Sequence, residues 1–248
     1  MIAILSPAKS LDYETERSMP TPTRPRLDER TDRLVARGKE MSVDDLMSKM
    51  KISQALAELN HGRWQDFENQ DEKPAIQVFD GDVYTGLDAK SMDEDDILFA
   101  QDHLRILSGL YGALRPLDLM RPYRLEMGTK RFPEDHKLSI WWDTAVADLL
   151  LDDMDENGDR TILNLASEEY YASIKGRLPD DVRIIDIRFM TGDRFITMHA
   201  KVARGTMARW MIDNRITDID AMKGFDYDGY VYDEEDSDAD TWTFRRAA

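Results

Sequence analysis

Four arginines lie close together in the segment Leu104–Gly128, which reads LRILSGLYGALRPLDLMRPYRLEMG. A guanidinium group is planar and can bind a phosphate or a carboxylate through two hydrogen bonds at once. The glycines Gly109 and Gly112 would let the backbone approach a ligand, and two Arg-Pro steps favour an extended chain. The segment is therefore predicted to bind anions. The alternative is a connector whose arginines neutralise neighbouring acids.

A second cationic element is predicted near the end of the chain, where Lys201–Arg215 has a helical pattern. At helical spacing Lys201 and Arg204 share one side, while Ala203 and Met207 face the opposite way. Lys9, which lies four residues after the apolar run Met1–Leu5, would be at the edge of the same cleft. The predicted anion-binding set is Lys9, Arg105, Gly109, Gly112, Arg115, Arg121, Arg124, Lys201, Arg204 and Arg209.

A second polar set mixes hydroxyls, carboxylates, a phenol and ammonium groups, which are the groups that transfer protons in enzymes. Most of its members follow predicted strands, which would bring them together. The set suggests an alternative function, an enzyme for a small anionic or nucleotide-like substrate. Its candidate catalytic residues are Ser6, Lys9, Asp82, Tyr84, Glu126, Asn164, Glu168 and Lys201, with Arg124 beside them.

Simpler explanations exist for part of this set. Ser167 would cap a helix, and acids such as Glu168 suit the first helical turn. The segment Gly81–Gly86 could be a tight turn or a substrate loop, and the sequence favours neither. Asn164 lies inside an apolar strand, and capping does not explain it.

The apolar patterns predict one α/β domain over residues 1–248, with a mixed β-sheet flanked by helices. The predicted strands are Met1–Leu5, Pro74–Phe79, Thr161–Leu165, Gly229–Tyr232, Thr241–Arg245 and a hairpin of Val182–Met190 with Arg194–Ala200. The predicted helices are about 27–41, 43–50, 55–67, 138–151 and 201–215, and one over 91–107 that begins with a capping box of Ser91 and Glu94.

The charge of the chain is strongly negative, with 50 acidic against 33 basic residues and a formal net charge of -17. A field of this sign repels nucleic acid and anionic membranes, so nucleic-acid binding would require a local basic cleft. No apolar run reaches the roughly 20 residues that span a bilayer, and the N-terminus lacks a signal-peptide pattern. We expect a cytoplasmic monomer that does not bind membranes.

Cysteine and histidine, two common metal ligands, are absent or sparse. The chain has no cysteine, and its four histidines are far apart in sequence, at His61, His103, His136 and His199. None of them has the spacing of a metal-binding helix. The sequence therefore predicts no metal site and no bound cofactor.

Five segments, in this order along the chain, resemble the YaaA family of bacterial peroxide-stress resistance proteins (UPF0246-type). They are SPAKSL (Ser6–Leu11), GDVYTGL (Gly81–Leu87), the arginine segment Leu104–Gly128, NLASEEY (Asn164–Tyr170) and KVARG (Lys201–Gly205). The resemblance covers essentially the whole chain.

The resemblance implies a protein that helps cells to survive hydrogen peroxide by limiting unincorporated iron and thereby Fenton damage to DNA. It further implies an uncommon α/β fold with a positively charged cleft that binds duplex DNA through a helix-hairpin-helix element. That element would fall on the Ser91–Leu107 helix and the turn Leu107–Gly112, where backbone N–H groups could meet a phosphate.

Overall fold

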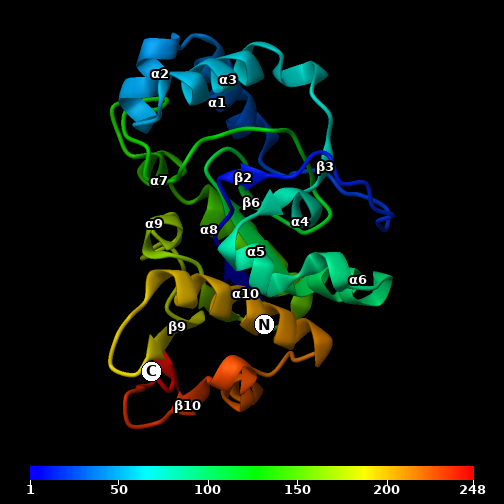
Figure 1. Cartoon of the computed structure of the whole chain (residues 1–248), viewed down its shortest axis with the longest axis vertical. Coiled ribbons are helices and arrows are strands. Elements are labelled where there is room, and N and C mark those ends of the chain that lie inside the picture. The colour runs from blue at the N-terminus through cyan, green and yellow to red at the C-terminus, as the bar shows by residue number, and fades with distance from the viewer.

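The central sheet is built from short, almost wholly apolar strands. β1 (Ile2–Leu5), β5 (Leu104–Ser108) and β8 (Thr161–Leu165) run parallel, with β1 between the other two. Parallel strands are covered on both faces and therefore need apolar side chains on both. The computed structural model, which describes residues 1–248, has a seven-stranded sheet in the order β10-β11-β9-β8-β1-β5-β6 (Figure 1). Its two edge strands, β6 and β10, are antiparallel to their neighbours.

Two pairs of very short strands lie outside this sheet. The remaining strands are β2 (Ser10–Leu11), β3 (Lys73–Pro74), β4 (Phe79–Asp80), β6 (Gly112–Leu114), β7 (Leu119–Met120), β9 (Arg183–Thr191), β10 (Val231–Asp233) and β11 (Thr241–Arg246). The helices are α1 (Asp28–Lys39), α2 (Val43–Met50), α3 (Gln54–Gln65), α4 (Ala75–Val78), α5 (Asp82–Leu87), α6 (Glu94–His103), α7 (Leu138–Trp141), α8 (Ala145–Asn157), α9 (Glu168–Tyr171) and α10 (Thr197–Asp213). Four 3₁₀ turns are Phe67–Asn69, Ala89–Ser91, Ile219–Gly224 and Tyr227–Gly229.

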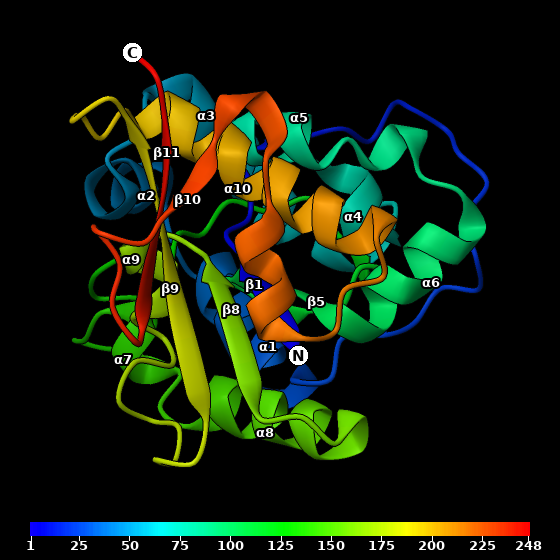
Figure 2. The same ribbon diagram turned by 90° about the horizontal axis from the view of Figure 1, so that it is seen from below.

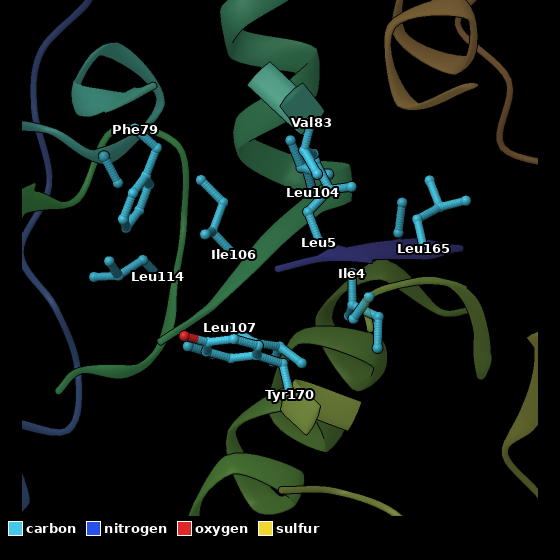
Figure 3. Packing of buried hydrophobic residues seen from close by; sticks show 14 of the residues in the cluster. Ile4, Leu5, Phe79, Val83, Leu104, Ile106, Leu107, Leu114, Leu165 and Tyr170 are labelled. Carbon is cyan, nitrogen blue, oxygen red and sulfur yellow. The ribbon is translucent and has the colours of Figure 1, made fainter. Parts of the chain in front are cut away.

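Helices cover both faces of the sheet, with α10 and α5 on one side and α8 on the other (Figure 2). Leu5 and Leu165 point toward Val83 of α5, whereas Ile4 points to the opposite face, toward Tyr170 (Figure 3). The helices α1, α2 and α3 gather at one end of the molecule (Figure 1). None of the helices combines the length and the apolar character needed to cross a membrane.

The predicted α/β class and mixed sheet are confirmed, because several elements carry strong local signals. The strands at Met1–Leu5 and Thr161–Leu165 are present as β1 and β8. At the start of α2, the Ser42 hydroxyl accepts from the backbone N–H of Asp45, whose carboxylate accepts from the N–H of Ser42. This reciprocal cap closes the first helical turn.

The helix-hairpin-helix element is not confirmed at its predicted position, Ser91–Gly112. Helix α6 ends at His103, and the chain continues as β5, a turn and β6, which form an antiparallel hairpin with Ser108 opposite Gly112. Pairing with β1 makes Leu104–Ser108 a strand, and this contact is distant in sequence. The N-cap of α6 is Asp93, which forms a capping box with Asp96 instead of the predicted Ser91 and Glu94.

Two predicted strands are helical instead. Ala75–Val78 forms helix α4, and all four of its side chains are buried, so apolar character alone could not separate a helix from a strand. Arg194–Ala200 forms only a single bridge to β9, between Arg194 and Thr191, because β8 and β11 already occupy both edges of that strand. The chain there turns into α10 at Thr197.

Candidate functional site

A pocket of about 490 Å³ opens where β1 and β8 end. Because these neighbouring strands are parallel, their carboxyl ends meet at the same edge of the sheet, where α/β proteins commonly bind ligands. The loops after the two strands form one wall, and α5 with α10 forms the other. The polar and aromatic residues that line the pocket are Ser6, Lys9, Ser10, Asp80, Asp82, Tyr84, Glu126, Ser167, Glu169, Tyr170, Lys201 and Arg204.

Ser6 and Ser167 connect the two strand ends by hydrogen bonds. The Ser6 Oγ accepts from the backbone N–H of Ser167 at 2.8 Å, and its own hydroxyl donates to the Ser167 Oγ at 3.1 Å. The Tyr84 hydroxyl donates to the Ser6 carbonyl at 3.0 Å. Burial raises the pKa of Tyr84 well above its ordinary value of 10, so this phenol remains protonated at neutral pH.

The opposite wall carries one ion pair and one guanidinium without a partner. The Lys201 Nζ lies 3.5 Å from a carboxylate oxygen of Asp82, and both side chains are nearly half exposed. Arg204, one helical turn further along α10, forms no ion pair, and its Nε is buried without a hydrogen-bond partner. Burial lowers the pKa of Arg204, and no carboxylate opposes this effect. A partly desolvated cation without a counter-charge favours an anionic ligand.

A basic groove of about 700 Å³ adjoins the pocket and shares Lys9, Glu126 and Glu169 with it. Its cationic lining residues come from the loop after β1, from the end of α2 and from the chain before α7. We call this feature the lysine groove, and its cations are Lys9, Lys49, Lys51, Lys130 and Arg131.

The cations of the lysine groove are only weakly compensated. Lys51 and Lys130 are exposed and form no ion pair or hydrogen bond, and Lys49 donates to the carbonyl of Arg131 at 3.2 Å. The Nζ of Lys9 lies 3.9 Å from Glu126, which pairs more closely with the Nε of Arg124, at 2.9 Å.

The carboxylates that line the same groove already form hydrogen bonds or ion pairs with other groups of the protein. Asp45 caps α2, and a carboxylate oxygen of Glu169 accepts from the N–H of Gly128. Glu126 pairs with Arg124, so it does not neutralise the exposed lysines of the groove.

Most of the predicted anion-binding arginines are neutralised within the fold. Arg105 is buried and donates to Asp153 at 2.7 Å, while the other three lie closer to the surface. Their ion pairs are Arg115 with Asp118 at 2.9 Å, Arg121 with Glu72 at 3.0 Å and Arg209 with Asp213 at 2.6 Å. These arginines match the connector that the sequence left as an alternative. Of the predicted set, Lys9, Lys201 and Arg204 line the pocket, and Arg124 lies beside it through Glu126.

Two of the three glycines of the arginine segment, Gly109 and Gly112, have packing roles. A Cβ atom on Gly109 would lie 2.0 Å from the carbonyl oxygen of Leu125. Gly112 has a φ of +72° and sits against Leu27 and Trp142. Both glycines are needed by the fold at these positions.

Six of the eight candidate catalytic residues line the pocket, and two lie elsewhere. Asn164 donates to Asp186 at 2.6 Å and accepts from the N–H of Ala166 at 3.0 Å, so it holds the turn after β8. Glu168 is exposed and pairs with Lys175 at 2.7 Å. The structure contains no group of three or more His, Asp or Glu side chains that could hold a metal ion.

Sequence reasoning missed Ser167, Glu169 and the lysines of the groove as site residues. Ser167 occupies the predicted N-cap position of α9, but its side chain caps no helical N–H and bonds to Ser6 instead. Its position directly after a buried strand was the available signal. Lys49, Lys51 and Lys130 follow no pattern, because they come from two segments about 80 residues apart in sequence.

Comparison with known proteins places this architecture in one family. Residues 1–236 match the family model described as "Peroxide stress protein YaaA". A UPF0246 protein of Rhizorhabdus wittichii is 48% identical over 249 residues, covering 98% of both chains. UPF0246 proteins of Alteromonas mediterranea and Cupriavidus metallidurans are 44% and 45% identical, and each match covers 99% of this chain and 98% of the relative. The chain therefore belongs to the YaaA family of peroxide stress proteins.

Proposed function

We propose that this member of the family protects cells from peroxide by binding duplex DNA along the lysine groove. The observation that carries the proposal is the grouping of five cations in one groove of a chain whose net charge is -17. Two of them, Lys51 and Lys130, have no partner within the protein. The cations of the groove repel each other, and a bound anion would offset this repulsion by attracting them. The phosphates of DNA would supply such anions.

Binding of this kind would be independent of base sequence, because ammonium groups contact phosphates and not base edges. The acidic remainder of the surface would repel the duplex and restrict contact to the groove. Each neutralised phosphate releases condensed counterions, so the affinity should fall steeply as salt is added.

The same release of counterions connects the proposal to Fenton damage. Iron(II) is attracted to the DNA phosphates as other cations are, and a hydroxyl radical formed there reacts with the nearest sugar or base. Ammonium groups that occupy these phosphates would displace iron together with the other counterions. In this proposal the protein limits the unincorporated iron that reaches DNA.

The test is fluorescence anisotropy of a labelled 20-base-pair duplex, titrated at several salt concentrations. We expect the double variant Lys51→Gln/Lys130→Gln to lower the slope of log K against log salt by about 2, since each lost phosphate contact contributes about 0.9. The control Lys175→Gln/Arg194→Gln removes two exposed charges outside the groove and should leave the slope unchanged. Absence of binding by the wild type at low salt would refute the proposal.

The pocket supports a second candidate function, catalysis on a small anionic or nucleotide-like substrate. The observation in its favour is that Glu126 and Asp82, each beside an ammonium group, share one pocket with the protonated phenol of Tyr84. Proton transfer requires acid and base groups within reach of one substrate. Incubation with phosphate esters and nucleotides, followed by ³¹P NMR, should reveal turnover that Glu126→Gln abolishes while duplex binding persists. No turnover of any of these substrates would rule out the enzyme.

A further inference from the structure

The hydroxyl of Ser167 accepts a hydrogen bond from Ser6. The Ser6 Oγ accepts the backbone N–H of Ser167 and donates its own proton to the Ser167 Oγ. The proton of Ser167 must therefore point elsewhere, and no protein group accepts it. Ser167 lines the pocket, so a hydrogen-bond donor without a protein acceptor is available to a ligand there.

Arg204 supplies a second group of the same kind on the facing wall. It lines the same pocket, is partly buried, and its Nε is shielded from solvent without an acceptor. Every other Lys or Arg that forms no ion pair or hydrogen bond in this structure is exposed: Lys51, Lys130, Lys137 and Arg194. The terminal nitrogens of Arg204 also have no hydrogen-bond partner and, unlike the Nε, are not sealed from solvent, so a ligand oxygen in the pocket can reach them.

We infer that this pocket binds the phosphate group of a nucleotide between the guanidinium of Arg204 and the hydroxyl of Ser167. The inference rests on the second candidate function, and it names the ligand class and two contacts that the candidate left open. A guanidinium and a hydroxyl are both donors, and phosphate oxygens are acceptors with the geometry that arginine matches best.

The remaining lining of the pocket indicates more than a bare phosphate. Its volume of about 490 Å³ is within the roughly 300–1,000 Å³ typical of small-molecule sites, and an inorganic phosphate would fill little of it. Asp80 and Asp82 line the same space and are acceptors only, so they suit sugar hydroxyls or a base amino group. A nucleoside monophosphate carries both kinds of group.

The nucleotide could come from two sources with the same chemistry. One is a free nucleoside monophosphate, and the other is the phosphorylated end of a DNA strand that lies in the lysine groove. The second source follows from the continuity of the two spaces, because the groove and the pocket share Lys9, Glu126 and Glu169.

The test uses the full chain and isothermal titration calorimetry with adenosine 5′-monophosphate, adenosine and inorganic phosphate as probes. We expect saturable binding of the monophosphate and at least about tenfold weaker binding of adenosine. Arg204→Gln and Ser167→Ala should each weaken monophosphate binding about 10- to 100-fold, the range for a lost hydrogen bond to a charged group. The matched controls Arg194→Gln and Ser18→Ala, both exposed and outside the pocket and the lysine groove, should leave it unchanged.

Several results would overturn the inference. These are no binding of the monophosphate, equal binding of adenosine, or equal affinities in Arg204→Gln and the wild type. Arg204→Lys provides a second variant in case Arg204→Gln fails to fold, and it should retain the charge but lose the two-pronged contact.

Two further experiments distinguish a free nucleotide from a DNA strand end as the ligand, and the groove proposal from the pocket inference. A 5′-phosphorylated duplex that binds more tightly than its 5′-hydroxyl counterpart, with the difference lost in Ser167→Ala, would support the strand end. A preference for the free monophosphate alone would support the free nucleotide. Lys51→Gln/Lys130→Gln should alter DNA binding without altering monophosphate affinity, so a failure of the groove and a failure of the pocket give different results.

Discussion

Gly86 and Gly205 face each other where α5 crosses α10, and the two helices touch through their backbones. A Cβ atom on Gly205 would lie 1.7 Å from the carbonyl oxygen of Val83, and one on Gly86 would lie 2.1 Å from that of Val202. Glycine alone allows this approach. The crossing sets the separation between Asp82 and Lys201, so it determines the shape of the pocket.

Replacement of Gly205 by alanine should therefore separate the two helices. We expect Gly205→Ala to lower the free energy of unfolding by about 3 kcal/mol or more, because the clash is with backbone and not with a flexible side chain. Gly62→Ala is the matched control, since Gly62 is also helical and has no atom within 4 Å of an added Cβ. That variant should gain about 0.5–1 kcal/mol from helix propensity. Urea denaturation of both variants tests the prediction, and equal effects would contradict it.

The fold was predictable where the signal is local. An apolar run bounded by polar residues identified β1 and β8, and the cap at Ser42 identified the start of α2. The same reasoning failed at Leu104–Ser108, because the pairing with β1 that makes it a strand joins residues about 100 positions apart. Ala75–Val78 was wrong for a different reason, since uniform burial removes the periodicity that separates a helix from a strand.

The part of the candidate site that lies at the ends of β1 and β8 was predictable from the sequence. Ser6 and the residues after β8 converge because neighbouring parallel strands end at one edge of the sheet. Whether a given arginine is free depends on carboxylates that are distant in sequence. Glu72 pairs with Arg121, and Asp153 pairs with Arg105. The two partners in each pair are about 50 residues apart, and no sequence pattern links them.

Asp153 is the centre of a buried ion network. It accepts two hydrogen bonds from Arg26 at 2.7 Å and one from Arg105 at 2.7 Å, and it is 2% exposed. We expect Asp153→Asn to cost about 3–5 kcal/mol, because it leaves two arginines without their counter-charge. Asp155→Asn breaks an exposed pair with Arg160 and should cost at most about 1 kcal/mol. Chemical denaturation at pH 7 measures both, and a small effect of Asp153→Asn would show that water already compensates the network.

The same carboxylate should make stability depend on pH. Burial by itself raises the pKa of Asp153, but hydrogen bonds and charge from Arg26 and Arg105 outweigh it and hold the pKa below its ordinary value. A group whose pKa is lower in the folded state stabilises the protein above its unfolded pKa of about 3.9. This stabilisation is lost as the pH falls through the folded value. The difference in unfolding free energy between wild type and Asp153→Asn should therefore shrink between about pH 5 and pH 2, and a constant difference would exclude Asp153 as the titrating group.

Variants of paired arginines such as Arg115, Arg121 and Arg209 test whether DNA binds at these arginines or along the lysine groove. Each of the three already pairs with a carboxylate of the fold, so a duplex would have to break that pair before it gained a phosphate contact. We expect Arg121→Gln and Arg209→Gln to leave the salt slope of duplex binding unchanged, whereas Lys130→Gln lowers it by about 0.9. Anisotropy titrations at four or more salt concentrations give the slopes, with circular dichroism to confirm folding. If the arginine variants lower the slope as much as Lys130→Gln does, the phosphates lie along Arg121 and Arg209, and the groove is not where DNA binds.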